Sequence, residues 1–141
     1  MARSCTTFDH TADVGLEARA DTLAELYQAL GEGLARFLCS SPARADEQRS
    51  LSVEAEDLEA LVVDFLWALQ TELQARRFVL AALEVTCLEE GPPARIAATL
   101  AGEPYDPERH ELESEVKAIT WHGLEVIRAE AGWRARVILD L

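Results

Sequence analysis

Residues 57–101 read DLEALVVDFLWALQTELQARRFVLAALEVTCLEEGPPARIAATLA, and the fold class follows from a change of apolar period within them. After Asp57, a typical helix N-cap, apolar residues recur at helical spacing. From Phe78 onward the apolar residues recur with the period of two that is typical of strands. A Gly-Pro-Pro turn signal interrupts them, so we predict one helix and then strands over 78–88 and 95–101.

The preceding half of the chain predicts a strand, a helix and a short strand. Residues 14–19 alternate between apolar and polar side chains, which indicates a strand with one buried face. Thr22 and Glu25 have capping-box spacing at the start of an apolar i, i+3, i+4 stripe, and the helix should end at residues 40–42, which read SSP. Residues 51–55 alternate again.

The remaining strand-like runs cover residues 115–121, 124–129 and 133–141, the last two joined by a tight Ala-Gly turn. Together the segments predict an α+β fold with two layers. Two helices would pack on one mostly antiparallel or mixed sheet of about six to seven strands. The length of 141 residues is that of a single domain spanning residues 1–141.

The charge of the chain narrows its partners. Acidic residues outnumber basic ones by 26 to 13, and the formal net charge is −13. This field repels phosphate, so we expect no extensive direct binding of nucleic acid. A basic protein partner or a cation fits the charge better than nucleic acid, although composition alone favours a role in solubility.

Cysteine usage and hydropathy favour a reduced, cytoplasmic protein that does not enter membranes. Cys5, Cys39 and Cys87 stand singly in apolar segments, which indicates free, buried thiols. The N-terminus lacks the apolar core of a signal peptide. The most apolar stretch, residues 61–69, is interrupted by Asp64 and is too short to span a bilayer.

No enzyme motif supports a self-contained catalytic centre. The chain has no GxxxxGK[ST], GxGxxG, GxSxG or HExxH sequence. Histidine chemistry would need two of His10, His110 and His122 to meet in the fold, and His110 belongs to a polar loop where we expect it to be solvated.

Two polar features interrupt apolar segments. Asp9, His10 and Asp13 come just before the strand at 14–19, where Asp13 taken alone is more simply explained as a turn or cap residue. At the other end, Asp140 and Leu141 close an apolar run. If the first and last strands were neighbours, the Asp13, Asp140 and terminal carboxylates would converge, and a hard cation would offset their repulsion.

Three motifs make the chain resemble the archease family from about Cys5 to Leu141. They are DHTADVG at 9–15, VKAITWHGLEV at 116–126 and VILDL at 137–141. The resemblance implies an accessory protein for RtcB-type tRNA-splicing RNA ligases, which join RNA ends with GTP and a divalent metal. Such a protein promotes ligase guanylylation and multiple turnover and catalyses no reaction alone.

The resemblance also implies a metal site made by Asp13, Asp140 and a main-chain or terminal oxygen of Leu141. Oxygen ligands favour a divalent ion, with calcium expected first and magnesium or manganese as alternatives. Four residues are candidates for supporting the site or contacting the partner, and for each a structural role is equally open: Asp9, His10, Lys117 and His122.

Two other functions fit the same residues. The carboxylates could hold the catalytic ion of a small metal-dependent phosphoesterase. Alternatively, Trp67, which projects away from the apolar stripe of the second helix, could serve a chaperone-like module for RNA-processing enzymes. The sequence leaves the oligomeric state open.

Overall fold

The computed structural model describes residues 3–10 and 13–141, and the side chains of Asp9 and His10 lie outside the described part. Its elements, in chain order, are β1 (Ser4–His10), β2 (Asp13–Ala20), α1 (Leu23–Leu38), β3 (Glu47–Ala55), α2 (Leu58–Gln70), the π-helical turn η1 (Thr71–Ala75), β4 (Phe78–Glu89), β5 (Ala94–Pro104), β6 (Ala118–Ala129) and β7 (Gly132–Asp140).

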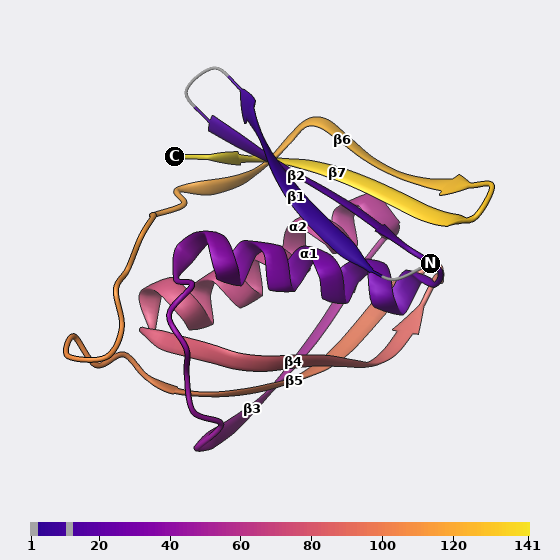
Figure 1. The fold of residues 1–141 in the computed structure, drawn as a ribbon. Helices are drawn as coiled ribbons and strands as arrows, with labels where there is room; N and C mark the ends of the chain where they lie inside the picture. Colours follow the sequence, from indigo (N-terminus) through magenta and orange to yellow (C-terminus); the bar gives the residue numbers. More distant parts are fainter. Residues whose placement is uncertain (1–2, 11–12) are drawn as a thin grey trace.

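The strands of the described residues form two antiparallel sheets, ordered β1-β2-β7-β6 and β3-β5-β4. Helix α1 packs on β2 of the larger sheet and on β4 of the smaller one, and α2 packs on β6 and β3. Both helices therefore lie between the sheets (Figure 1). The predicted α+β class, with two helices on about seven antiparallel strands, is confirmed. The expected single sheet in a two-layer arrangement is wrong, because the helices are covered on two sides.

Two glycines of α1 show why one helix can contact both sheets. A β-carbon at Gly31 would lie 2.5 Å from Leu83 Cδ2 on β4, and one at Gly33 would clash with Cys5 Sγ on β1. Each glycine thus admits a side chain from a different sheet against the helix backbone. The predicted apolar stripe marks only part of the helix surface that is buried.

The predicted helix starts are confirmed. Thr22 Oγ1 accepts a hydrogen bond from the Glu25 main-chain N–H at 3.2 Å, and Asp57 Oδ1 accepts one from the Ala60 N–H at 2.8 Å. Each bond satisfies an N–H group that the first helical turn leaves without a partner. In the described part of the chain, no helix is long and apolar enough to cross a membrane.

Three strand predictions need correction. Strand β1 was not expected, and β3 begins at Glu47, before the predicted 51–55. Both are edge strands. The side chains of β1 are mostly polar and residues 47–50 of β3 are all polar, so neither segment has the apolar alternation on which the prediction relied. The two runs at 115–121 and 124–129 form one strand, β6, with an irregularity in its pairing between Thr120 and Glu125.

The expectation of buried thiols is wrong for Cys87. All three cysteines are free, but Cys87 is exposed, whereas Cys5 and Cys39 are partly buried. A register shift in β4 between Val85 and Cys87 explains the difference, because an inserted residue reverses the face on which later side chains lie. Burial raises the pKa of the Cys5 thiol to about 11.

Candidate functional site

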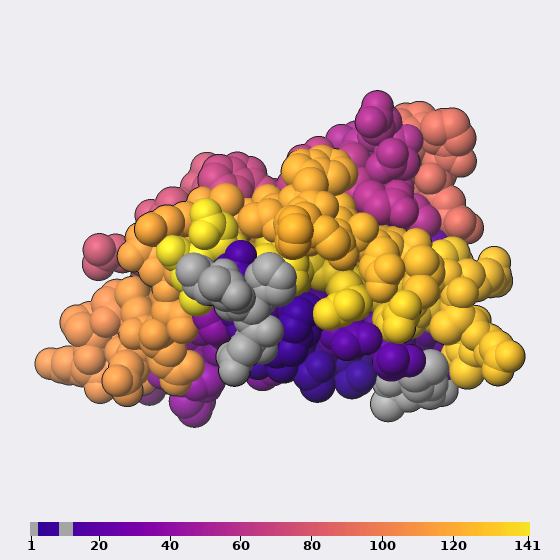
Figure 2. Space-filling view, turned by 90° about the horizontal axis from the view of Figure 1, so that it is seen from above, coloured from indigo at the N-terminus to yellow at the C-terminus, as the bar shows by residue number. Residues whose placement is uncertain are grey.

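The two aspartates singled out in the sequence lie directly opposite each other. Strands β2 and β7 are adjacent, with Asp13 paired to Asp140 at one end of the ladder. The next residues along these strands, Val14 and Leu139, are buried in the core. Because side chains alternate along a strand, both aspartates lie on the outer face of the larger sheet. In Figure 2 the yellow C-terminal residues surface beside the indigo N-terminal strands.

The pairing brings two negative charges together. Directly opposed residues of an antiparallel ladder have β-carbons about 4.5–5.5 Å apart, and like charges at such positions are destabilising. Carboxylate oxygens at this separation suit a hard divalent cation such as Ca²⁺, Mg²⁺ or Mn²⁺. The strand that follows Asp13 and the last strand are therefore neighbours, as the predicted convergence of the two aspartates required.

The described part of the chain offers no third acidic, histidine or cysteine side chain as a further ligand for such a cation. Among the described side chains, no three of these types come together in a group that could hold a metal. The exposed Leu141 follows Asp140 directly, so its main-chain oxygen is the next oxygen that could act as a ligand along the chain. The proposed contributions of the Asp9 and His10 side chains lie outside the described residues, although both backbones belong to β1.

The two candidate residues of the second motif occupy different places. Lys117 lies just before β6, and its main-chain N–H donates to the Asp140 carbonyl oxygen at 2.8 Å. His122 is exposed in the irregular part of β6, next to Gly123, whose φ of +64° is in the left-handed region. The main chain of Lys117 is therefore bonded to one member of the aspartate pair, whereas His122 lies in the bulge farther along β6. Asp13 and His122 each have an interaction partner.

The bulge of β6 also exposes a large apolar side chain. Between Thr120 and Glu125 the strand advances five residues while β7 advances two, so extra residues project from the ladder. Trp121 is one of them and is 59% exposed. Bulges often change the direction of a side chain beside a functional site, and this one follows the strand segment that borders Asp140.

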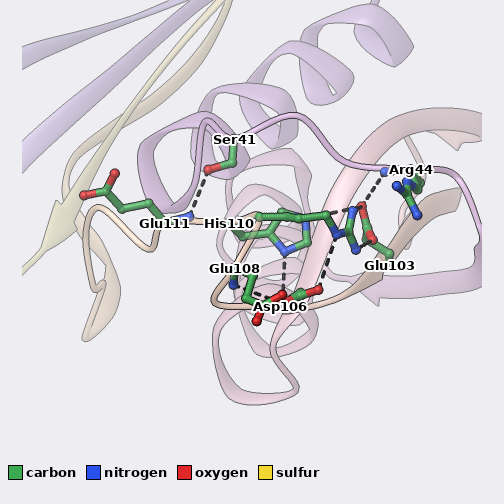
Figure 3. Close-up of polar contacts among 8 residues, drawn as sticks. Ser41, Arg44, Glu103, Asp106, Glu108, His110 and Glu111 are labelled. Carbon is green, nitrogen blue, oxygen red and sulfur yellow. Dashed lines mark hydrogen bonds and ion pairs between the residues drawn. The ribbon is translucent and has the colours of Figure 1, made fainter.

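A second polar cluster lies elsewhere in the molecule, and it corrects the expectation that His110 is solvated. The His110 side chain is fully buried against Glu103, which is 2% exposed. The Asp106 main-chain N–H donates to His110 Nδ1 at 2.9 Å, so the other ring nitrogen, Nε2, carries the proton and donates to Glu103 Oε2 at 3.2 Å. Figure 3 shows how Glu103, Asp106 and His110 converge.

Every described feature of this cluster indicates a structural role. Glu103 also accepts from the Arg44 main-chain N–H at 2.6 Å and forms a two-pronged pair with the Arg109 guanidinium. The Arg109 hydrogen bonds, then the Arg44 bond, lower the pKa of the Glu103 carboxyl to about 2. Its oxygens are occupied by protein donors, so it is not poised as an acid or base. The sign of this cluster in the sequence was the carboxylate of Glu103 at the end of an apolar strand.

The chain matches the Archease protein family (MTH1598/TM1083) over residues 6–141. Protein archease of Pyrococcus abyssi is 32% identical over 136 residues, which cover 95% of this chain and 96% of the relative. Protein archease of Thermococcus gammatolerans is 34% identical over 136 residues, with the same coverage of both chains.

Solved structures agree with the fold. The solution structure of Methanobacterium thermoautotrophicum protein 1598 superposes with a TM-score of 0.81 and 27% identity, covering 99% of both chains. The crystal structure of an archease from Thermotoga maritima, described as a possible chaperone, has a TM-score of 0.58 and 18% identity over 96% of both chains. The match over nearly the whole sequence, together with the curated relatives, shows that this chain belongs to the archease family.

Proposed function

We propose that this chain is a non-catalytic accessory protein that activates an RtcB-type tRNA-splicing RNA ligase. In this proposal it promotes ligase guanylylation and multiple turnover through a divalent cation held by Asp13, Asp140 and an oxygen of Leu141. The observation that carries the proposal is the opposed pair of aspartates at the outer end of the β2–β7 ladder. Directly opposed like charges are destabilising, and a cation bound between the two carboxylates would offset their repulsion.

The donor set fits a hard cation. Carboxylate, main-chain and terminal oxygens are the ligands of Ca²⁺, Mg²⁺ and Mn²⁺, whereas zinc sites usually include histidine or cysteine. When bound, the ion would supply a positive charge that holds the acidic end in one arrangement or is presented to the ligase. Asp13 and Asp140 would provide its anionic ligands, and Lys117 would fix the Asp140 backbone through its N–H donor.

The charge of the chain supports a protein partner rather than RNA as the main contact. A net charge of −13 disfavours phosphate and favours a basic surface, such as the cleft of an RNA-binding enzyme. The exposed Trp121 offers an apolar anchor beside the acidic end, because exposed aromatic side chains often dominate protein interfaces. We place this contact in the cytoplasm.

A turnover assay tests the proposal. The cognate ligase is incubated with GTP, Mn²⁺ and excess RNA substrate, with and without this chain, and joined product is counted per ligase molecule. We expect the number of turnovers to rise when the chain is present and the stimulation to fall with added salt. An unchanged turnover number would refute the activator function.

The role of Leu141 gives a separate prediction. A tag fused after Leu141 converts its carboxylate into an amide and removes one negative charge from the proposed ligands. We expect weaker cation binding by calorimetry and a smaller stimulation of the ligase than for the same tag at the N-terminus. Equal values for both tagged proteins would remove the terminal carboxylate from the site without affecting the case for Asp13 and Asp140.

One observation favours a chaperone-like binding module as a second candidate. Trp67 on α2 is 50% exposed, and such a side chain suits contact with apolar segments of client proteins. Trp67→Ser should then reduce the capture of several RNA-processing enzymes without altering stimulation of the ligase. A phosphoesterase, the other alternative, would show activity of the chain alone towards phosphate esters with Mg²⁺ or Mn²⁺.

A further inference from the structure

Two glutamines hold the main chain at Val116, in a segment without helix or strand structure. Gln74 Oε1 accepts from the Val116 N–H at 2.8 Å, and Gln74 Nε2 donates to the Val116 carbonyl oxygen at 2.9 Å. Gln70 Nε2 donates to the same carbonyl oxygen at 2.7 Å. One side-chain amide thus provides the donor and the acceptor that a neighbouring strand would provide. We call Gln70 and Gln74 the glutamine clasp.

The spacing of the two glutamines explains how both reach the Val116 carbonyl group. Gln70 ends α2, and Gln74 lies within η1, where the Arg76 N–H donates to the Thr71 carbonyl oxygen five residues back. Side chains four residues apart lie on the same face of a helix, so both amides lie on the side that contacts Val116. π-helical turns such as η1 are rare and frequently occur at functional sites.

The residue that the clasp holds, Val116, directly precedes the residue that is bonded to Asp140. Val116 is followed by Lys117, whose N–H donates to the Asp140 carbonyl oxygen at 2.8 Å. The next residue, Ala118, begins β6 and is the register partner of Asp140. The Gln70 side chain is buried, and the Val116 side chain is fully buried, so the hydrogen bond between them is shielded from water. Hydrogen bonds in such surroundings are costly to break.

Other contacts hold the same connection farther upstream. The Glu111 N–H donates to Ser41 Oγ at 2.9 Å, and the Glu113 N–H donates to the Leu38 carbonyl oxygen at 3.0 Å. These bonds fix the course of the connection across the end of α1. They leave its last residues, before β6, to the glutamine clasp.

We infer that Gln70 and Gln74 are positioning residues for the acidic end. By fixing the Val116 peptide, they set Lys117 against Asp140 and keep the Asp140 carbonyl and side chain in place opposite Asp13. The inference rests on the proposed function for its consequence in cation binding, but its structural step can be measured without a cation. Residues behind the ligands of metal sites commonly change affinity by roughly 10- to 100-fold.

Gln74→Leu removes both hydrogen bonds of Gln74 and keeps the size of the side chain. Without added metal, we expect the Lys117 amide hydrogen to exchange about tenfold faster, because its bond to Asp140 loses its fixed neighbour. Amides at the centre of the β2–β7 ladder should keep their protection. In calorimetric titration with Ca²⁺, the variant should bind roughly tenfold more weakly. Gln74→Glu keeps an acceptor for the Val116 N–H and should restore part of the protection.

Gln28→Leu is the matched control. Gln28 Oε1 accepts from the Val85 N–H at 3.1 Å, so this variant also removes a glutamine-to-backbone bond, but between α1 and β4. It should leave Lys117 exchange and Ca²⁺ affinity unchanged even if it lowers stability. Equal exchange of the Lys117 amide in the wild type, Gln74→Leu and Gln28→Leu would overturn the inference. If the wild-type chain itself binds neither Ca²⁺ nor Mn²⁺, the cation in the proposed function fails, while the exchange of Lys117 still decides the role of the clasp.

Discussion

Replacing Asp13 or Asp140 by asparagine is expected to weaken Ca²⁺ or Mn²⁺ binding by roughly 100-fold and to remove the stimulation of the ligase. Asparagine keeps the shape and one carbonyl oxygen of each ligand but loses its charge. The site depends on charge, because the two residues are opposed across the β2–β7 ladder. Calorimetry with the isolated chain and the turnover assay with the ligase measure the two effects separately.

Stability gives a second readout of the same substitutions. Without a cation, removing one of two opposed carboxylates should leave the chain as stable or stabilise it by about 0.2–1 kcal/mol. A cation that binds only the folded chain should raise the midpoint of thermal unfolding of the wild type but not of the variants. Asp64→Asn, which removes an exposed charge from α2, is the matched control and should behave as the wild type. Wild-type affinity in Asp13→Asn would rule out this residue as a ligand.

The parts of the fold that could be predicted are those with a regular apolar period and cap residues. Strand β2 and both helices have regular apolar spacing and cap residues, and their starts agree with the structure. The edge strand β1 has no such pattern, since its residues are mostly polar and, among its described side chains, only Cys5 and Phe8 are partly buried. The second sheet was missed because the apolar stripe of α1 does not show that the helix is covered on two sides. The sign of the second contact is small residues, such as Gly31 and Gly33, that let side chains approach the helix backbone.

The site was predictable only in part, for a similar reason. Spacing along the chain identified Asp13 and Asp140 as unusual, but their opposition depends on the register of strands more than a hundred residues apart. The roles of Gln70 and Gln74 depend on contacts across 42 residues or more, which no local pattern in the sequence indicates. His110 was wrongly expected in solvent because its partner, Glu103, lies seven residues away on the preceding strand.

The Glu103 cluster gives the largest expected effect on stability. Glu103→Ala would leave the buried His110 Nε2–H and the Arg44 N–H without acceptors, and Arg109 without its main partner. Removing one member of a buried, hydrogen-bonded set is strongly destabilising, so we expect the midpoint of thermal unfolding to fall by roughly 10 °C or more. Glu56→Ala, which removes an exposed carboxylate, should leave the midpoint unchanged.

The dependence on pH distinguishes the charge of Glu103 from its packing. The pKa of its carboxyl is lowered to about 2 in the folded chain, from an ordinary value of 4.5, chiefly by Arg109. The stabilisation is therefore fully present above pH 4.5 and is lost as the pH falls from 4.5 towards 2. Glu103→Gln keeps the shape but has no proton to gain, so its stability should be lower than that of the wild type at pH 7 and should change less over this range. If urea unfolding at pH 7, 5 and 3 gave parallel losses in both proteins, the charge of Glu103 would not be what holds the cluster together.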